Sequence, residues 1–349
     1  MIALPELAAR AAIWLTEPGP EADRVLSTRV RLARNLRGAV FVGRASDDEL
    51  ARTQRAVSEA AQQTPLLAGG GALDVGQLSV LDRQLLLERR LISHDLTADS
   101  RSRGLVFSGD EKTSIMINEE DHLRIQALEG GLQLEATYAR AVALDSALGE
   151  RLEYAWTPEF GFLTACPTNV GTGMRASVLL HLPALVLSQQ IKKILAGITQ
   201  VGLTVRGFYG EGTEVVGNFF QISNQITLGE EEADTLNKLA RVVRQILDWE
   251  QRAQERLRRD AGLQLEDKCS RALGVLRQAR LLSSQEMIAL LSAVRLSHSL
   301  GLRNAPSLAV LNGLLVRGQP AHVQRSSGRE MTSEERNEAR AKLVREAVG

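Results

Sequence analysis

The stretch Asn118–Arg124, NEEDHLR, places three acidic side chains, a histidine and an arginine within seven residues. It follows the alternating run TSIMIN, so these side chains are expected at the end of a strand. Carboxylates in such a place can grip a cation or accept a proton. His122 could serve as a metal ligand or a base, but no second histidine lies at ligand spacing, so structural hydrogen bonding is the expected role.

A pair of arginines, Arg29 and Arg31, lies in the run STRVRLARN from Ser27 to Asn35. Two residues apart on a strand, they point to the same face, where two guanidinium groups could grip one phosphate chain. A salt-bridged surface strand would explain the pair equally well.

Two glycine-containing stretches add further candidates, CPTNVGTGMRAS from Cys166 to Ser177 and RGFYGEGTE from Arg206 to Glu214. Glycine-rich backbone amides with an arginine suit an anion, and a thiol near positive groups would have a lowered pKa. The alternatives are a small buried apolar Cys166 and a Glu211 that is only a hairpin charge facing water.

The composition excludes several classes of function. Lys plus Arg and Asp plus Glu are 42 each in 349 residues, so no global field attracts nucleic acid or a membrane, and phosphate binding must be local. No signal peptide or membrane-length apolar run is present, which predicts a cytoplasmic protein. Cys166 and Cys269 are too few for a disulfide framework or a cysteine-rich zinc site. No metal site is predicted. Since no P-loop or kinase catalytic loop occurs, any ATP would be held by arginines.

The elements that must position these residues divide near residue 255. Strand-like runs and helical patterns alternate before that point, and a helix from about Glu230 closes this part. Helical spacing dominates afterwards. The glycine-rich stretch 69–76 is interpreted as a flexible turn. The predicted strands are GLVFS (104–108), TSIMIN (113–118), GFLTA (161–165), GLTVRG (202–207) and NFFQISNQITL (218–228).

Taken in order, the motifs STRVR, NEEDHLR, CPTN-G-G-RAS and RG--GE-TE followed by ISN resemble the phosphagen (guanidino) kinase family over about residues 24–254. Details favour its bacterial protein-arginine kinase branch. Gly212 replaces a usual histidine, Phe220 and Gln221 replace Tyr-Asp, and a helical domain follows the catalytic one instead of preceding it.

This resemblance implies an α+β fold, with a mostly antiparallel sheet flanked by helices and a following α-helical domain. It implies an N-terminal segment 1–23, a catalytic domain 24–254, and a helical domain 255–349 for dimerisation and phosphoarginine binding. Transfer of the ATP γ-phosphate to protein arginines is implied, with Mg²⁺ bridging phosphate oxygens. The alternatives are a free-arginine kinase and a non-catalytic phosphoarginine-binding adaptor, the adaptor ranking last because both glutamates and Cys166 are present.

The resemblance also assigns roles to residues. Glu120 and Glu211 would clasp the substrate guanidinium and accept its proton, with Cys166 as a thiolate beside it. Arg29, Arg31, Arg124, Arg175 and Arg206 would grip phosphates. The full ATP set implied is Ser27, Thr28, Arg29, Val30, Arg31, Arg124, Arg175, Ala176, Ser177, Val178, Leu179, Arg206, Gly207, Phe208, Tyr209, Gly210 and Glu211.

Two departures from the family pattern stand out. Arg90 occupies the place of an adenine-contacting histidine, where a guanidinium could still stack on the base. The tail element RNEARA resembles a phosphoarginine-binding R-D-x-x-R-A, with Arg336, Asn337, Arg340 and Ala341 as its residues. Asn337 in place of Asp predicts weaker phosphoarginine sensing. A solvated terminal helix is the alternative for this tail.

The partners that the resemblance implies are arginine-presenting protein substrates, a ClpC-type AAA+ protease, a heat-shock repressor and a zinc-containing activator protein. It also implies a homodimer. Neither direct nucleic-acid binding nor membrane binding is expected.

Overall fold

The computed structural model describes residues 4–98, 101–207, 216–302 and 305–349. Within these ranges the centre is an eight-stranded sheet in the order β2-β3-β4-β5-β1-β8-β10-β9, with every neighbouring pair antiparallel. This confirms the predicted antiparallel sheet. Its strands are β1 (Val25–Arg34), β2 (Gly71–Asp74), β3 (Gly104–Phe107), β4 (Thr113–Ile117), β5 (Leu123–Gly130), β8 (Met174–His181), β9 (Leu203–Arg206) and β10 (Phe219–Asn224). A separate hairpin pairs β6 (Trp156–Thr157) with β7 (Gly161–Phe162).

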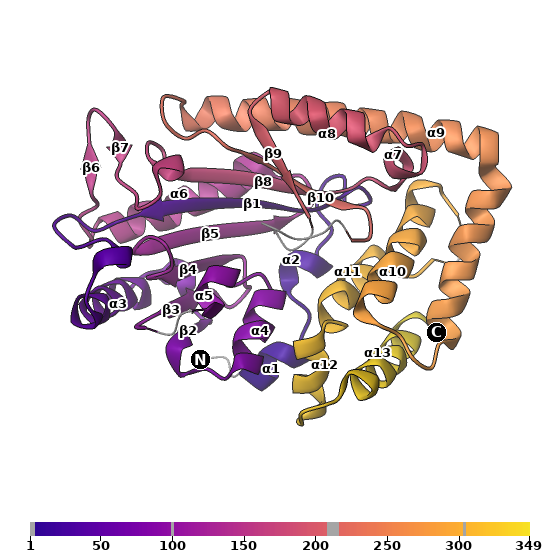
Figure 1. Ribbon diagram of the computed structural model, residues 1–349, viewed down its shortest axis with the longest axis horizontal. Helices are drawn as coiled ribbons and strands as arrows, with labels where there is room; N and C mark the ends of the chain where they lie inside the picture. Colours follow the sequence, from indigo (N-terminus) through magenta and orange to yellow (C-terminus); the bar gives the residue numbers. More distant parts are fainter. Residues whose placement is uncertain (1–3, 99–100, 208–215, 303–304) are drawn as a thin grey trace.

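Helices flank the sheet and continue beyond it. Short 3₁₀ turns lie at Val42–Arg44, Pro65–Leu67, Val75–Gln77 and Pro167–Asn169. The α-helices before the C-terminal region are α1 (Leu4–Ala9), α2 (Ile13–Thr16), α3 (Asp47–Gln62), α4 (Val80–Glu88), α5 (His94–Ala98), α6 (Leu134–Gly149), α7 (Pro183–Leu187) and α8 (Ile191–Gln200). Those of the C-terminal region are α9 (Glu232–Gln278), α10 (Ser284–Ser299), α11 (Leu308–Arg317), α12 (Pro320–Ser327) and α13 (Ser333–Val348). Figure 1 shows α10–α13 gathered at one end of the molecule, with the first helices against them.

One face of the sheet is apolar because residues opposite each other on antiparallel strands point the same way. Val30 of β1 pairs with Ala127 and Ala176, and Val178 of β8 pairs with Ile222. All are fully buried in one cluster with apolar residues of α6 and α9. This burial fixes the register, since a slip of one residue would turn the opposite set of side chains into the core.

The other face is divided into a polar and an apolar part. Leu128, Leu179 and Phe219 lie at its apolar end and pack with Trp14 of α2 and with α10, α11 and α13 in a second core. The C-terminal helices therefore complete the core of the sheet.

The predicted boundary at residue 254 falls inside α9, which continues to Gln278. Helical geometry breaks at Ala261, where φ is −145° and ψ is 35°. The first part of α9 lies over the apolar face of the sheet, and the second part packs against α10 and α13.

The interpretation of 69–76 as a flexible turn is wrong, because this stretch contains the edge strand β2. A Cβ at Gly71 would lie 2.7 Å from the ring of Phe107 on the paired strand β3. Glycine is therefore required here for close strand packing, and glycine in a strand is easily misinterpreted as a turn.

The other predicted strands are observed with shifted ends. The runs 104–108, 113–118 and 202–207 correspond to β3, β4 and β9. The run 161–165 keeps only Gly161–Phe162 as strand, and 218–228 ends its strand at Asn224.

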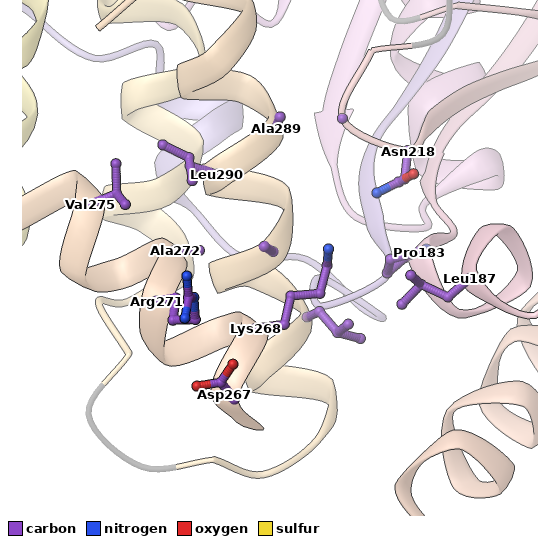
Figure 2. A pocket seen from close by; sticks show the side chains of 13 residues that line it. Pro183, Leu187, Asn218, Asp267, Lys268, Arg271, Ala272, Val275, Ala289 and Leu290 are labelled. Carbon is purple, nitrogen blue, oxygen red and sulfur yellow. The ribbon is translucent and has the colours of Figure 1, made fainter. Parts of the chain in front are cut away.

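A cavity of about 600 Å³ lies between the C-terminal helices and the sheet-containing part of the chain, where their packing leaves a gap. Figure 2 shows Pro183, Leu187 and Asn218 on one side and Lys268 and Arg271 of α9 on the other. Of the helices described, none has the length and apolarity needed to cross a membrane.

Candidate active site

The polar part of the divided sheet face carries arginines from four strands, and we call it the arginine face. Arg31 lies directly opposite Arg175, and Arg206 lies opposite Gln221. Ala33 lies opposite Arg124 and shares its face with Arg31. The residues of the arginine face are Arg29, Arg31, Arg124, Arg175 and Arg206, so the sheet brings together the arginines singled out in the sequence.

These guanidinium groups are close enough to repel one another. Burial, together with the charges of Arg90, Arg124, Arg175 and Arg206, lowers the pKa of Arg29 to about 9. The pKa of Arg31 is lowered for the same reasons, with Arg29 the largest charge contributor. Arg31 is only 8% exposed, so the interpretation as a salt-bridged surface strand is wrong.

On the arginine face, buried donor atoms of Arg29 and Arg31 find no acceptor among the described residues. Among the residues described, the Nε atoms of Arg29 and Arg31 have no hydrogen-bond partner. One terminal nitrogen of Arg29 donates to Oε1 of Gln221 at 3.0 Å. An anion with several oxygens would satisfy these donors and relieve the repulsion, so the arginine face fits a polyphosphate.

The acidic turn between β4 and β5 lies at the edge of this face. Glu119 points inward, is 4% exposed and pairs with Arg124, while the Ser93 hydroxyl also donates to it. Burial alone would raise the pKa of Glu119, but the Arg124 charge and hydrogen bond outweigh it and leave the pKa lowered. Glu119 therefore orients an arginine of the face and stays ionised.

Glu120 points the other way, toward the loop that contains Cys166. Its carboxylate accepts a hydrogen bond from Nδ2 of Asn169 at 3.3 Å and another from the Cys166 thiol. Shielding from water by this loop, together with the negative charge of Asp121, raises the pKa of Glu120, although the residue as a whole is exposed. A carboxylate with a raised pKa is suited to accept a proton near neutral pH.

Asp121 holds the turn and the cysteine loop together. Its Oδ1 accepts hydrogen bonds from Nδ2 of Asn35 at 2.6 Å and from the backbone N–H of Ala165 at 2.7 Å. Ala165 precedes Cys166, so Asp121 sets the position of the thiol relative to Glu120. This role was not predicted from the sequence, where its only signal is the third acid in the run.

The cysteine loop is irregular and tightly packed. Cys166 precedes the 3₁₀ turn Pro167–Asn169, and its Sγ lies 3.0 Å from Oγ1 of Thr168. Gly171 has φ of 109°, and a Cβ there would lie 2.2 Å from the carbonyl oxygen of Thr227. Cys166 is half-buried, so it is not a buried apolar side chain.

His122 has the structural role expected from the sequence. The backbone N–H of Leu36 donates to its Nδ1 at 3.0 Å, and its Nε2 lies 2.9 Å from the carbonyl of Val40. Burial lowers the pKa of His122, so the ring is neutral with the proton on Nε2. Cys269 is buried elsewhere, among Leu265, Leu296 and Leu300.

The remaining residues of the implied ATP set separate by face. Ser177 lies opposite Arg29, and Ser27 and Leu179 lie further along the same face. Gly207 follows β9. Thr28, Val30, Ala176 and Val178 turn to the apolar side, where the Thr28 hydroxyl donates to Gly131. Phe208, Tyr209, Gly210 and Glu211 lie outside the described residues.

Arg90 joins the edge of the arginine face. It is buried, has φ of 63°, and lies over the Trp14 ring at 5.9 Å. Its charge is the largest of those that lower the pKa of Arg29. The side chain therefore contributes to the same positive field.

The tail element lies on α13 and is half turned inward. Arg340 is buried and donates to the carbonyls of Gly318 and Leu282 and to Oδ1 of Asn337, the last at 2.7 Å. Ala341 is in the core, while Arg336 is half-buried and donates to the carbonyl of Met331. Asn337 thus orients a buried arginine.

Comparison with known proteins agrees with this geometry. Residues 53–253 match the family model "ATP:guanido phosphotransferase, C-terminal catalytic domain", and residues 262–349 match "Protein-arginine kinase McsB C-terminal domain". The chain is 48% identical to a protein-arginine kinase of Moorella thermoacetica, with 97% of this chain and 98% of that one covered. It is 45% identical to that of Symbiobacterium thermophilum, with 97% and 98% covered.

Solved structures of small-molecule guanidino kinases share the catalytic fold. Lombricine kinase superposes with a TM-score of 0.59 at 25% identity, covering 70% of each chain. The duplicated taurocyamine kinase from Schistosoma mansoni gives 0.60 at 27% identity, covering 69% of this chain and 34% of the duplicated one. The arginine face, the acidic turn and both family matches lead to one conclusion: the chain belongs to the protein-arginine kinases, ATP-dependent phosphotransferases of the guanidino kinase family.

Proposed function

We propose that the arginine face holds the triphosphate of ATP and that Glu120, with Glu211, holds the guanidinium of a protein arginine opposite it. The observation that carries this is the juxtaposition of mutually repelling arginines with a carboxylate of raised pKa at their edge. Two of these arginines have buried Nε atoms that lack acceptors among the described residues.

Deprotonation of the substrate is the chemical obstacle. A guanidinium has a pKa of about 12.5 to 13.8, so its nitrogen has no free lone pair at neutral pH. Glu120 would orient one nitrogen toward the γ-phosphate and accept its proton as the N–P bond forms and the bond from the γ-phosphorus to its bridging oxygen breaks, releasing ADP. Asn169 and Asp121 hold Glu120 and the Cys166 loop in place, and such positioning supplies up to about 7 to 11 kcal/mol of the barrier reduction.

ATP supplies the phosphoryl group, and Mg²⁺ would neutralise charge on its oxygens. Arg29, Arg31, Arg124, Arg175 and Arg206 would bind those oxygens through paired N–H groups and stabilise the charge that develops during transfer. Lysine would present a point charge in place of a planar fork. Cys166 would lie as a thiolate beside the guanidinium.

The biological role is part of the proposal. The enzyme would work in the cytoplasm under stress and mark arginines of damaged proteins for a ClpC-type protease. It would also control a heat-shock repressor. The helical region would support a homodimer and sense phosphoarginine through Arg336, Asn337 and Arg340, and a zinc-containing protein would activate the kinase. The match of residues 262–349 to the protein-arginine kinase C-terminal domain supports this role.

The test compares free arginine with an unfolded protein as acceptor for MgATP. Mass spectrometry under conditions that spare the acid-labile P–N bond should find phosphoarginine in the protein, and Glu120→Gln should lower the rate about 10²- to 10⁴-fold. Modification of free arginine alone would favour a phosphagen kinase. Undiminished turnover of the variant would refute the role of Glu120.

A further inference from the structure

A groove lies behind the cysteine loop, between the β6–β7 hairpin and the segment that leads into α9. Its volume is about 270 Å³. We call it the hairpin groove, and its defining side chains are Trp156, Glu159, Phe160, Leu228, Glu230 and Glu232. Figure 1 shows the hairpin projecting at the end of the molecule away from α10–α13.

The back wall of the hairpin groove is continuous with the active site. Phe162 and Gly171 exchange backbone hydrogen bonds of 2.8 and 3.2 Å, and the N–H of Thr172 donates to the carbonyl of Thr227 at 3.1 Å. The Thr227 hydroxyl lies 2.8 Å from the carbonyl of Thr168. The loop that presents Cys166 and Asn169 to Glu120 therefore forms the back wall of this groove.

The walls of the groove present large apolar side chains to solvent. Trp156, Phe160 and Leu228 are 49%, 45% and 50% exposed. Ile226, just before the groove, is 45% exposed. Clustered exposed aromatics of this kind are typical of surfaces that bind another chain.

The charge of the groove is acidic. Glu159, Glu230 and Glu232 line it, and its described lining contains neither lysine nor arginine. Lys238 lies outside the lining and pairs with Glu230 at 3.4 Å. Arg34, whose guanidinium lies 3.5 Å from the centre of the Phe162 ring, is paired with Asp145 at 2.8 Å. Glu159 and Glu232 remain available to a basic partner.

We propose that the hairpin groove binds the polypeptide that flanks the target arginine, and that it selects a basic and a large apolar residue a few positions away. This inference rests on phosphoryl transfer to protein arginines. An extended chain advances about 3.3 to 3.6 Å per residue, so flanking residues can pass from the Glu120 side of the loop to its back. Chains that expose basic and apolar side chains together are those of unfolded proteins, since folding buries the apolar ones.

Peptides with one arginine each test the selection. One carries a lysine and a leucine near the arginine, and its partner carries serines there. With the full chain and MgATP, kcat/KM should be about tenfold higher for the lysine-leucine peptide, mainly through KM, because two favourable contacts of this size amount to about 1.4 kcal/mol.

The variant Glu159→Lys/Glu232→Lys should remove most of this preference, so that kcat/KM for the lysine-leucine peptide falls toward that for the serine peptide. Glu59→Lys, which reverses an exposed charge on α3, is the matched control and should keep the preference. Because the wild-type peptide comparison needs no variant, misfolding of the double variant would not remove the test.

Equal kcat/KM for both peptides, or a preference that survives the double charge reversal, would overturn the proposal. A concentration-dependent dimer that Phe160→Ser abolishes, with peptide preference intact, would assign the surface to self-association and also overturn it. Absence of transfer to any peptide or protein is a different pattern, which would refute the kinase activity itself.

Discussion

Replacement of Arg29 by methionine is expected to stabilise the protein without nucleotide while weakening nucleotide binding. Burial, together with the neighbouring arginines, lowers the pKa of Arg29 from its ordinary value to about 9. At about 1.4 kcal/mol for each pKa unit, the folded chain carries on the order of 5 kcal/mol of unfavourable charge burial there. Methionine keeps the apolar stem but loses the hydrogen bond to Gln221, so a net gain of about 1 to 3 kcal/mol in unfolding free energy is expected.

The assay is urea denaturation with and without saturating MgATP. MgATP should stabilise the wild type more than Arg29→Met, because ligand binding adds RT ln(1 + [L]/Kd) and the loss of one charged hydrogen bond weakens binding about tenfold to a hundredfold. The matched control is Arg89→Met. Arg89 is fully buried but pairs with Glu111 at 2.6 Å, so its loss should cost about 3 to 5 kcal/mol.

The opposite signs of the two arginine variants are the discriminating result. If Arg29→Met without nucleotide unfolds at lower urea with an unchanged slope, the arginine face is not repulsive. Equal stabilisation of wild type and Arg29→Met by MgATP would show that Arg29 does not contribute to nucleotide binding.

Three further outcomes are expected. Asp121→Asn should keep the contact to Ala165 but remove a charge that adds to the effect of burial in raising the pKa of Glu120, so the acid limb of the pH–kcat profile should move to lower pH. Asp121→Ala should also lower kcat/KM about tenfold or more, and unmoved profiles would contradict the positioning role. Burial lowers the pKa of His181 well below that of the unfolded chain, so its contribution to stability is complete above about pH 6.5 and is lost as pH falls, by up to about 1.4 kcal/mol per pH unit. Urea denaturation at a series of pH values should show that the unfolding free energy of His181→Gln depends less on pH than that of the wild type. Asn337→Asp in the full chain should bind a phosphoarginine peptide about tenfold more tightly, because a carboxylate at this position can pair with the guanidinium part of the ligand where the amide brings no charge, and equal affinities would remove the idea.

Much of the site could be predicted because its chemistry is written in short motifs. Arg29 and Arg31 two residues apart on a strand had to share a face, and the sheet register brings Arg175 opposite Arg31. The structural role of His122 followed from the lack of a second ligand. The helical tail followed from periodicity, and the antiparallel sheet followed from the resemblance.

The features that could not be predicted depend on contacts between distant segments. The role of Asp121 needs the N–H of Ala165, and that of Asn169 needs Glu120, 49 residues away in sequence. β2 was missed because the ring of Phe107 requires glycine opposite it. None of these contacts can be seen within a local window of sequence.

The path of α9 across both cores has a consequence for where the chain could be divided. A cut on either side of the break at Ala261 severs a helical segment of α9, and loss of the chain beyond Ala261 would uncover Leu128, Leu179 and Phe219 beneath α10 and α11. Leu128 and Leu179 belong to β5 and β8, the strands that also carry Arg124 and Arg175 of the arginine face. Shortened forms ending near residue 254 should therefore aggregate instead of behaving as independent enzymes. The C-terminal helices are best regarded as the cover that keeps this part of the kinase sheet out of water.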